Sequence, residues 1–365
     1  MWRFHNPVDV QFGSGCLATL PERLNGRRYA LVTYDEPFFT ELTETITTLA
    51  GAPQVVINNV EPNPDIVNLE LLCQEQCSNG QPEVIVALGG GSVMDTAKFL
   101  SAAGSDFEQT KSYITEGGGK GQLLCTPVIA IPTTAGTGSE VTCWATIWDK
   151  QAQRKYSLAD AGLYPEAALC DPDLTLQLPL ALTLSTGLDA LSHALESIWN
   201  KNRNGVSSAL AVEAVNIILD TLPRLVRQPD NARFRTDMMK AALKAGLAFS
   251  NTKTSIAHNI SYAVTLQSGT PHGIACSFTL PQVLRSVIGL DREVDSDLKA
   301  IFGHDLNKAW DQFDGWFREL GVNTDPEGYG YNRENWRQLL LDALQGERGK
   351  NFIGQQEALL ACYEK

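Results

Sequence analysis

Residues 84–98, VIVALGGGSVMDTAK, join an apolar run, a glycine turn and the start of a helical pattern. The run Val84–Leu88 has no polar alternation, which is typical of a strand buried on both faces of a sheet. The GGGS turn at residues 89–92 allows close backbone approach to a phosphate, and the amides that begin a following helix favour an anion. Because the spacing is not GxGxxG, a purely structural turn is an equal alternative.

Three more apolar runs in the first half resemble this strand: residues 28–33, 53–57 and 128–131. Runs of this kind separated by helical patterns predict a doubly wound, mostly parallel sheet. From about Leu178 the strand signal fades, and leucines from Leu184 to Leu195 recur at helical spacing. We therefore predict a dinucleotide-binding α/β domain at 1–178 and an all-helical, metal-binding and substrate domain at 179–365.

Composition narrows the class of protein. The net charge of −13 argues against binding nucleic acid or an anionic membrane surface. The sequence shows neither a long apolar run typical of a membrane span nor the apolar core of a secretion signal. Its eight cysteines are scattered, and Cys73 and Cys77 are expected to be ordinary helix residues. These features predict a cytoplasmic protein with reduced thiols.

The second half contains a candidate metal site. In GLDALSH, Asp189 and His193 are four residues apart, so they share one face of a helix. His258 and His272 follow, and these three histidines are among only five in the chain. One carboxylate and three imidazoles suit a divalent ion such as Fe²⁺ or Zn²⁺, and an open coordination position would let the ion polarise a carbonyl. The set therefore favours catalysis.

Two further features of the first half suit a dinucleotide. PTTAGTGSE at residues 132–140 follows the fourth strand with hydroxyls and flexible amides, although a plain polar loop would look similar. Asp35 follows the first strand, where a carboxylate accepts from an adenosine ribose and repels a 2′-phosphate. This position favours NAD(H) over NADP(H), while a solvated turn acid remains the alternative.

Several motifs occur together in a specific order: GGGSVMDTAK, PTTAGTGSEVT, DPDLTLQLP, GLDALSHALES and the pair His258 and His272 followed by Gly273. In these motifs, up to about residue 285, the chain resembles the iron-containing (group III) alcohol dehydrogenases. The resemblance implies the dehydroquinate synthase-like architecture of that family, reversible NAD(P)-dependent reduction of an aldehyde, and a homodimer.

The resemblance also implies roles for individual residues. The metal ligands would be Asp189, His193, His258 and His272. Together with Asp35, the residues implied to bind the dinucleotide are Gly89, Gly90, Gly91, Ser92, Asp95, Thr133, Thr134, Thr137 and Lys155. Many members of the family have an HxxxH arrangement in which the first histidine corresponds to His258. Four residues later, where those members have the second histidine, this chain has Tyr262. Tyr262 is therefore a candidate catalytic residue that hydrogen-bonds substrate or ribose, or else a packing aromatic.

The segment SNTKTSIAHNISY at residues 250–262 is similar to the phosphonate-associated branch, the phosphonoacetaldehyde reductases. That similarity implies reduction of phosphonoacetaldehyde to 2-hydroxyethylphosphonate. A phosphonate requires charge-assisted hydrogen bonds, and Lys253, Arg348 and Lys350 are the candidate cations, with exposed surface residues as the alternative. The rival functions are a general short-chain alcohol or lactaldehyde-type dehydrogenase, a dehydroquinate synthase-like lyase, and a non-catalytic metal and nucleotide sensor.

Overall fold

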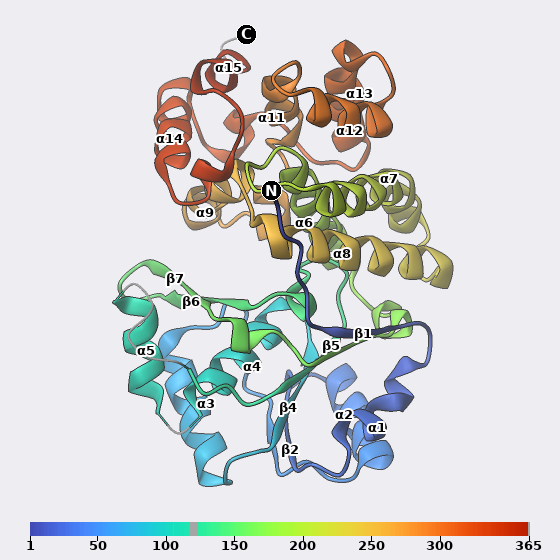
Figure 1. The fold of residues 1–365 in the computed structure, drawn as a ribbon, viewed down its shortest axis with the longest axis vertical. Coiled ribbons are helices and arrows are strands. Elements are labelled where there is room, and N and C mark those ends of the chain that lie inside the picture. Colours follow the sequence, from blue (N-terminus) through green and yellow to red (C-terminus); the bar gives the residue numbers. More distant parts are fainter. Residues whose placement is uncertain (105, 117–122, 364–365) are drawn as a thin grey trace. The chain divides into compact units, whose positions relative to one another are not determined.

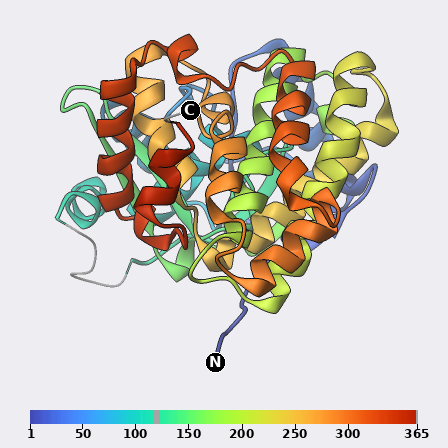
Figure 2. The same ribbon diagram turned by 90° about the horizontal axis from the view of Figure 1, so that it is seen from above.

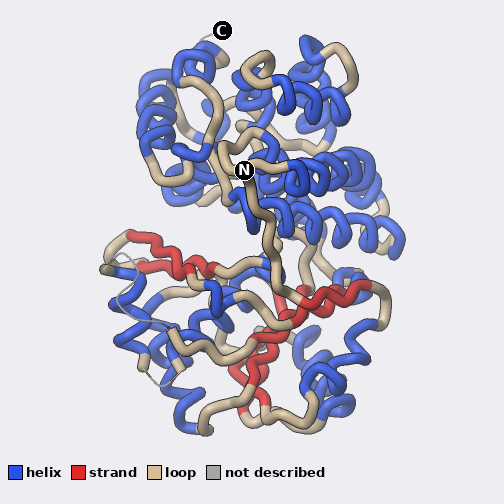
Figure 3. Tube along the Cα trace, viewed as in Figure 1, coloured by secondary structure: helices blue, strands red, loops and turns tan. Residues whose placement is uncertain are grey.

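The computed structural model describes residues 1–104, 106–116 and 123–363. The chain divides into two compact units. The α/β unit comprises Pro7–Thr134 and Ser139–Thr175, and the helical unit comprises Met1–Asn6, Ala135–Gly138 and Leu176–Lys365. Residues 1–6 and 135–138 thus belong to the helical unit, although they lie outside the range 179–365 that the sequence predicts for it. Among the described residues, all named strands lie in the α/β unit (Figure 3).

A parallel sheet with strand order β1-β8-β5-β4-β2-β3 forms the centre of the α/β unit (Figure 1). Its strands are β1 (Asp9–Phe12), β2 (Tyr29–Val32), β3 (Val55–Ile57), β4 (Val84–Gly89), β5 (Val128–Pro132) and β8 (Ala167–Cys170). The four apolar runs found in the sequence are β2 to β5. A separate antiparallel hairpin pairs β6 (Trp144–Asp149) with β7 (Arg154–Ala159).

Helices cover both faces of the sheet, as the uninterrupted apolar runs predict. On β2, Leu31 packs in one cluster with Leu20 of α1 and Ile46 of α2. Its neighbour Ala30 packs on the opposite face with residues of α3 and α4, including Leu69. The helices of this unit are α1 (Leu20–Leu24), α2 (Pro37–Ala50), α3 (Ile66–Ser78), α4 (Gly91–Ala103) and α5 (Phe107–Thr115). The predicted doubly wound α/β fold is confirmed.

Ten helices make up the rest of the described helical unit. They are α6 (Leu180–Ile198), α7 (Gly205–Arg227), α8 (Ala232–Thr252), α9 (Ile256–Ser268), α10 (His272–Ala275), α11 (Leu280–Val287), α12 (Arg292–Phe302), α13 (Ala309–Glu319), α14 (Arg333–Gln345) and α15 (Gln356–Ala361). Helices α6, α7 and α8 pack on one another, and Figure 2 shows them side by side in yellow-green to yellow. The leucine periodicity that begins at Leu184 therefore marks the buried face of α6.

By length and composition alone, α7 is apolar enough to cross a membrane. It packs against α6 and α8, however, and its residues Ala211, Val215, Ile218 and Leu222 are fully buried in these contacts. A core helix of a globular unit has the same composition as a short membrane span. This packing covers part of the apolar surface of α7, since 44% of its apolar window is buried.

Candidate active site

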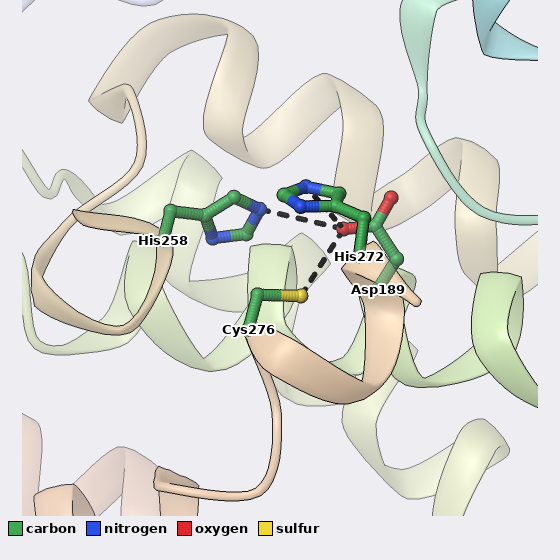
Figure 4. Close-up of side chains that lie close together, drawn as sticks. All are labelled: Asp189, His258, His272 and Cys276. Carbon is green, nitrogen blue, oxygen red and sulfur yellow. Dashed lines mark hydrogen bonds and ion pairs between the residues drawn. The ribbon is translucent and has the colours of Figure 1, made fainter. Parts of the chain in front are cut away.

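The predicted metal ligands Asp189 and His193 lie one turn apart on α6 and are both buried. His258 lies near the start of α9, and His272 is the first residue of α10. Gly273 lets α10 approach α6 closely, because a Cβ atom at this position would lie 1.8 Å from the carbonyl oxygen of Ser185. The structure thus brings residues from three helices together around Asp189 (Figure 4).

The three imidazoles point the same ring atom at one carboxylate oxygen. Asp189 Oδ1 lies 3.7 Å from Nε2 of His193, 3.4 Å from Nε2 of His258 and 3.8 Å from Nε2 of His272. Ligands of a tetrahedral ion with bonds of about 2.0–2.2 Å lie about 3.3–3.6 Å apart. The observed separations from Asp189 are close to this spacing. Among the described residues, Asp189, His258 and His272 also belong to a group whose ligand atoms all lie within 4.8 Å of one another, and its fourth member is Cys276 rather than His193. This group fits a divalent ion.

Electrostatics prepare these groups to bind a cation. Burial opposes ionisation of Asp189, but the neighbouring imidazoles, with His193 contributing most, hold its pKa well below the usual range. Burial lowers the pKa of His193 to about 4 despite the nearby Asp189 carboxylate, so its imidazole is neutral near pH 7. Metal ligands must be an ionised carboxylate and neutral imidazoles, and both residues meet that requirement.

Cys276 is a further candidate ligand that sequence reasoning missed. Its Sγ donates to Asp189 Oδ1 over 3.4 Å, and its ligand atom lies within 4.8 Å of those of Asp189, His258 and His272 (Figure 4). Burial raises the pKa of this thiol well above its usual value, so it is neutral. Its position four residues after His272 on a helical turn was the available signal.

Glu196 is a second residue that the sequence analysis did not select. It lies three residues after His193 on α6, is fully buried, and its Oε2 lies 2.6 Å from Nδ1 of His258. Burial raises its pKa, but the His258 charge and hydrogen bonds from His258 and Ser255 outweigh that effect and lower it. Glu196 is therefore an ionised carboxylate next to a candidate ligand.

Tyr262 and Arg348 lie beside the histidines. The Tyr262 ring is parallel to that of His272 with centroids 6.5 Å apart, and the Arg348 guanidinium lies 4.9 Å from the centre of the Tyr262 ring. Burial lowers the pKa of Arg348 to about 10, with an opposing contribution from Glu196, so it stays a cation near neutral pH. Among the described residues, no carboxylate lies within ion-pair distance of this guanidinium.

The other two candidate cations, Lys253 and Lys350, lie on segments that adjoin the segment of Arg348. Lys350 is exposed in the 3-10 helix Gly349–Asn351 that follows Arg348. Asn351 Nδ2 donates to the carbonyl of Thr254 over 2.9 Å, next to the exposed Lys253. Three cations from two distant parts of the sequence therefore lie on adjoining segments of the helical unit.

Within the α/β unit, the glycine turn after β4 lies beside Thr133 and Thr134, which follow β5. Gly90 is the N-cap of α4, and Thr133 N donates to the carbonyl of Gly89 over 3.1 Å. A Cβ on Gly90 would lie 3.1 Å from the side chain of Thr134. The start of α4 thus presents free amides beside hydroxyls, an arrangement suited to a pyrophosphate. Ser92 of the same turn accepts from Asn63 N over 3.1 Å.

Asp95 and Lys155 have contacts within the α/β unit. Asp95 accepts from Thr146 N over 3.1 Å and from the hydroxyl of Ser139 over 3.3 Å, and burial raises its pKa to about 6 despite the charge of nearby Lys98. Lys155 Nζ lies 5.4 Å from the centre of the Trp148 ring. Asp95 therefore anchors the β6 strand in addition to any contact with a dinucleotide.

The other predicted dinucleotide residues occupy different surroundings. Asp35 is exposed just after β2 and accepts from Asn58 Nδ2 over 3.3 Å. Gly91 begins α4. Thr137 lies in Ala135–Gly138, which belongs to the helical unit. Asp35 and Gly91 thus follow the ends of β2 and β4, whereas Thr137 belongs to the other unit.

Comparison with known proteins identifies the family. The model of the iron-containing alcohol dehydrogenases matches residues 7–172, and the model of the C-terminal region of that family matches residues 183–362. The chain belongs to the iron-containing alcohol dehydrogenase family. It is therefore an oxidoreductase, which agrees with the predicted dehydrogenase and not with the lyase or the non-catalytic sensor.

Relatives with named activities cover most of the chain. The NAD-dependent methanol dehydrogenase of Bacillus methanolicus is 32% identical over 293 residues, 78% of this chain and 75% of that protein. The 1,3-propanediol dehydrogenase of Citrobacter freundii is 32% identical over 310 residues, 81% of this chain and 78% of that protein. Aldehyde–alcohol interconversion is thus the reaction class.

Solved structures share the fold over the entire chain. Sulfoacetaldehyde reductase from Bifidobacterium kashiwanohense, in complex with NAD⁺, gives a TM-score of 0.89 at 29% identity and covers 100% of this chain and 98% of its own. A 1,3-propanediol oxidoreductase gives 0.88 at 26% identity, with 100% and 99% covered. The predicted cofactors, iron and NAD(H), agree with the family description and with this NAD⁺ complex.

Proposed function

We propose that this protein reduces phosphonoacetaldehyde to 2-hydroxyethylphosphonate with NADH, using a divalent metal held by Asp189, His193, His258 and His272. The observation that carries the substrate assignment is the Arg348 guanidinium beside the histidines, which is partly buried, stacked on Tyr262 and without a carboxylate in ion-pair distance among the described residues. A partly buried cation of this kind is stabilised by an anionic partner within hydrogen-bond distance. A substrate with an anionic group supplies it.

The ligand residues suit the reaction. A divalent ion held there supplies Lewis acidity toward a carbonyl oxygen, and the nicotinamide supplies the hydride. Asp189 and the three imidazoles bring one negative charge, so the loaded site keeps a net positive charge. Tyr262 carries Arg348 on its ring face next to His272, which sets the distance between the anion-binding cation and the reacting end.

A named relative supports the substrate class. Sulfoacetaldehyde, the substrate in the name of the Bifidobacterium kashiwanohense enzyme, is a two-carbon aldehyde with an anionic tetrahedral group. Phosphonoacetaldehyde has the same shape and more negative charge. The general short-chain aldehydes implied by the methanol and propanediol dehydrogenases lack an anion, and they would leave Arg348 without a partner.

A panel of aldehydes tests this proposal. We expect iron- or zinc-reconstituted protein to oxidise NADH with phosphonoacetaldehyde at a kcat/KM at least about tenfold above that with propionaldehyde, because a charge-assisted hydrogen bond contributes about 1.5–3 kcal/mol. Sulfoacetaldehyde is the comparison substrate in this panel, because it has a similar shape and less negative charge than phosphonoacetaldehyde. A higher kcat/KM with propionaldehyde or lactaldehyde would overturn the phosphonate assignment and leave a general dehydrogenase. Preference for sulfoacetaldehyde would reassign the anion.

Dinucleotide binding is proposed for the loops at the ends of β4 and β5. The amides at the start of α4 and the hydroxyls of Thr133 and Thr134 would hold the pyrophosphate. Asp35 at the end of β2 would accept from the adenosine ribose and favour NAD(H) over NADP(H). A homodimer and a cytoplasmic location remain predictions.

The unusual backbone conformation of Lys253 allows its contribution to substrate binding to be tested separately from its effect on stability. Its φ of 64° and ψ of 173° lie in a region that glycine alone adopts readily, and a strained residue of this kind costs about 1–3 kcal/mol. We expect Lys253→Gly to raise the thermal unfolding midpoint by about 2–4 °C. It should also lower kcat/KM for phosphonoacetaldehyde severalfold, because an exposed cation contributes about 1 kcal/mol or less.

Lys253→Ala is the matched control, since alanine removes the charge but keeps the strained conformation. It should reproduce the loss of activity without the gain in the unfolding midpoint. Unchanged kinetics with phosphonoacetaldehyde in both variants would exclude Lys253 from substrate binding.

A further inference from the structure

The carboxylate of Glu196 has four hydrogen-bond donors around it. Oε1 accepts from N of Ala257 over 2.6 Å and from N of His258 over 3.1 Å. Oε2 accepts from N of Ser255 over 2.9 Å and lies 2.6 Å from Nδ1 of His258. The side chain has no exposed surface. A buried carboxylate needs this degree of hydrogen bonding to offset the loss of water.

Three of these donors are the amides at the beginning of α9. Ser255, the N-cap residue of that helix, makes no capping hydrogen bond with its own side chain. The first amides of a helix have no partners within the helix and carry a partial positive charge. Glu196 supplies the missing acceptor from α6, and this contact joins the helix that carries Asp189 and His193 to the helix that carries His258.

The fourth donor determines how the His258 ring is used. Both oxygens of Glu196 accept from backbone amides, so this carboxylate acts as the acceptor and Nδ1 of His258 carries the proton that faces it. In the neutral ring, Nε2 is then the atom with the free lone pair. Nε2 has no hydrogen-bond partner among the described residues and lies 3.4 Å from Asp189 Oδ1. Once the ring is neutral, as metal binding requires, its lone pair therefore faces the other candidate ligands.

His193, the other buried histidine of the site, has no comparable carboxylate acceptor for its outer ring nitrogen in the part of the chain that the structure describes. Among the described residues, no carboxylate faces its Nδ1; His193 has the backbone of Gly136 as a hydrogen-bonding neighbour, and its ring stacks on Phe249 with centroids 4.0 Å apart. Hydrogen bonding of the outer ring nitrogen to a carboxylate fixes the tautomer and increases the basicity of a metal-binding histidine. Of these two histidines, His258 alone has this support.

We propose that Glu196 is a positioning residue, which fixes the Nδ1–H tautomer and the orientation of His258 and thereby raises the affinity of the site for a divalent ion. The inference rests on the metal site of the proposed function but not on the substrate. Because the hydrogen bonds exist in the metal-free chain, the tautomer is testable without metal.

Glu196→Gln is the informative change, because glutamine keeps the size but presents an amide donor. We expect ¹⁵N-histidine NMR of the metal-free protein, at mildly alkaline pH, to show the Nδ1–H tautomer for His258 in the parent and a shift toward Nε2–H in the variant. Zn²⁺ affinity, measured by competition with a chromogenic chelator, should fall about 10- to 100-fold. Glu213→Gln on the exposed face of α7 is the control and should change neither quantity.

A second variant separates positioning from helix capping. In Glu196→Gln combined with Ser255→Asp, the new aspartate caps α9 locally and should recover the thermal stability lost in the single variant. The Zn²⁺ affinity should stay low, because the local cap does not reach Nδ1 of His258. An unchanged tautomer and unchanged Zn²⁺ affinity in Glu196→Gln would overturn the proposal, as would full recovery of affinity by the local cap. Absence of Zn²⁺ binding in the parent protein would instead refute the metal site.

Discussion

His258→Ala should remove both the bound metal and the activity. This ring supplies one of the four converging donor atoms and is the one held by Glu196. Removing it leaves an incomplete ligand set and a buried Glu196 carboxylate without one of its donors. We expect NADH oxidation with any aldehyde to fall by at least about 10³-fold, or about 4 kcal/mol, because the ion is the main electrostatic aid to the reaction. Metal content per chain, measured by mass spectrometry, should fall in parallel.

Exposed His304 supplies the control, since His304→Ala removes an imidazole far from the ligand motifs in sequence and should keep both metal and activity. Far-ultraviolet circular dichroism checks that the helices of the His258 variant are intact. Turnover that persists in metal-free parent protein would refute the metal-dependent mechanism, whatever the variant does.

The sheet was predictable where its strands are buried on both faces. The strands β2, β4 and β5 are apolar on both faces, because helices cover both sides of them, and β3 packs its Val55 and Ile57 into one of the same two clusters. The edge strand β1 reads DVQF and β8 reads AALC, and neither has the β-branched run that marks a strand. Their pairing depends on contacts across more than 150 residues of sequence, which local patterns do not record.

The candidate site shows a similar division. Asp189 and His193 were visible because metal-ligand residue types recur at helical spacing, and their convergence with His258 and His272 agrees with that reading. Glu196 shares the helix face but was passed over, because a glutamate on a helix is usually solvated. Its role follows only from its burial and from the start of α9 beside it.

The three candidate cations could likewise be selected from the sequence but not ranked by it. In the sequence, Lys253, Arg348 and Lys350 are indistinguishable from surface residues. The structure distinguishes Arg348, since it alone of the three is partly buried and stacked on an aromatic ring next to His272. Burial depends on how the segment after α14 packs, and Gly349 permits that packing because a Cβ there would lie 2.0 Å from the carbonyl of Ala343.

Arg348→Ala should therefore affect the anionic substrate selectively. The guanidinium presents several donors in a fixed plane, which suits the oxygens of a phosphonate. Truncating one partner of a buried charge pair costs about 2–5 kcal/mol. We expect kcat/KM for phosphonoacetaldehyde to fall about 100- to 1,000-fold, while kcat/KM for propionaldehyde changes less than about threefold, because the ligand residues are untouched. Steady-state NADH oxidation with both aldehydes measures the ratio.

Two further variants make this result specific. Arg348→Lys keeps the charge but loses the planar arrangement of donors, so it should recover only part of the activity with phosphonoacetaldehyde. Arg333→Ala, at an exposed position at the start of α14, should leave both aldehydes unaffected. Equal losses with both aldehydes in Arg348→Ala would mean that the arginine supports the fold around Tyr262 rather than the substrate, and the phosphonate assignment would then lose the observation that carries it.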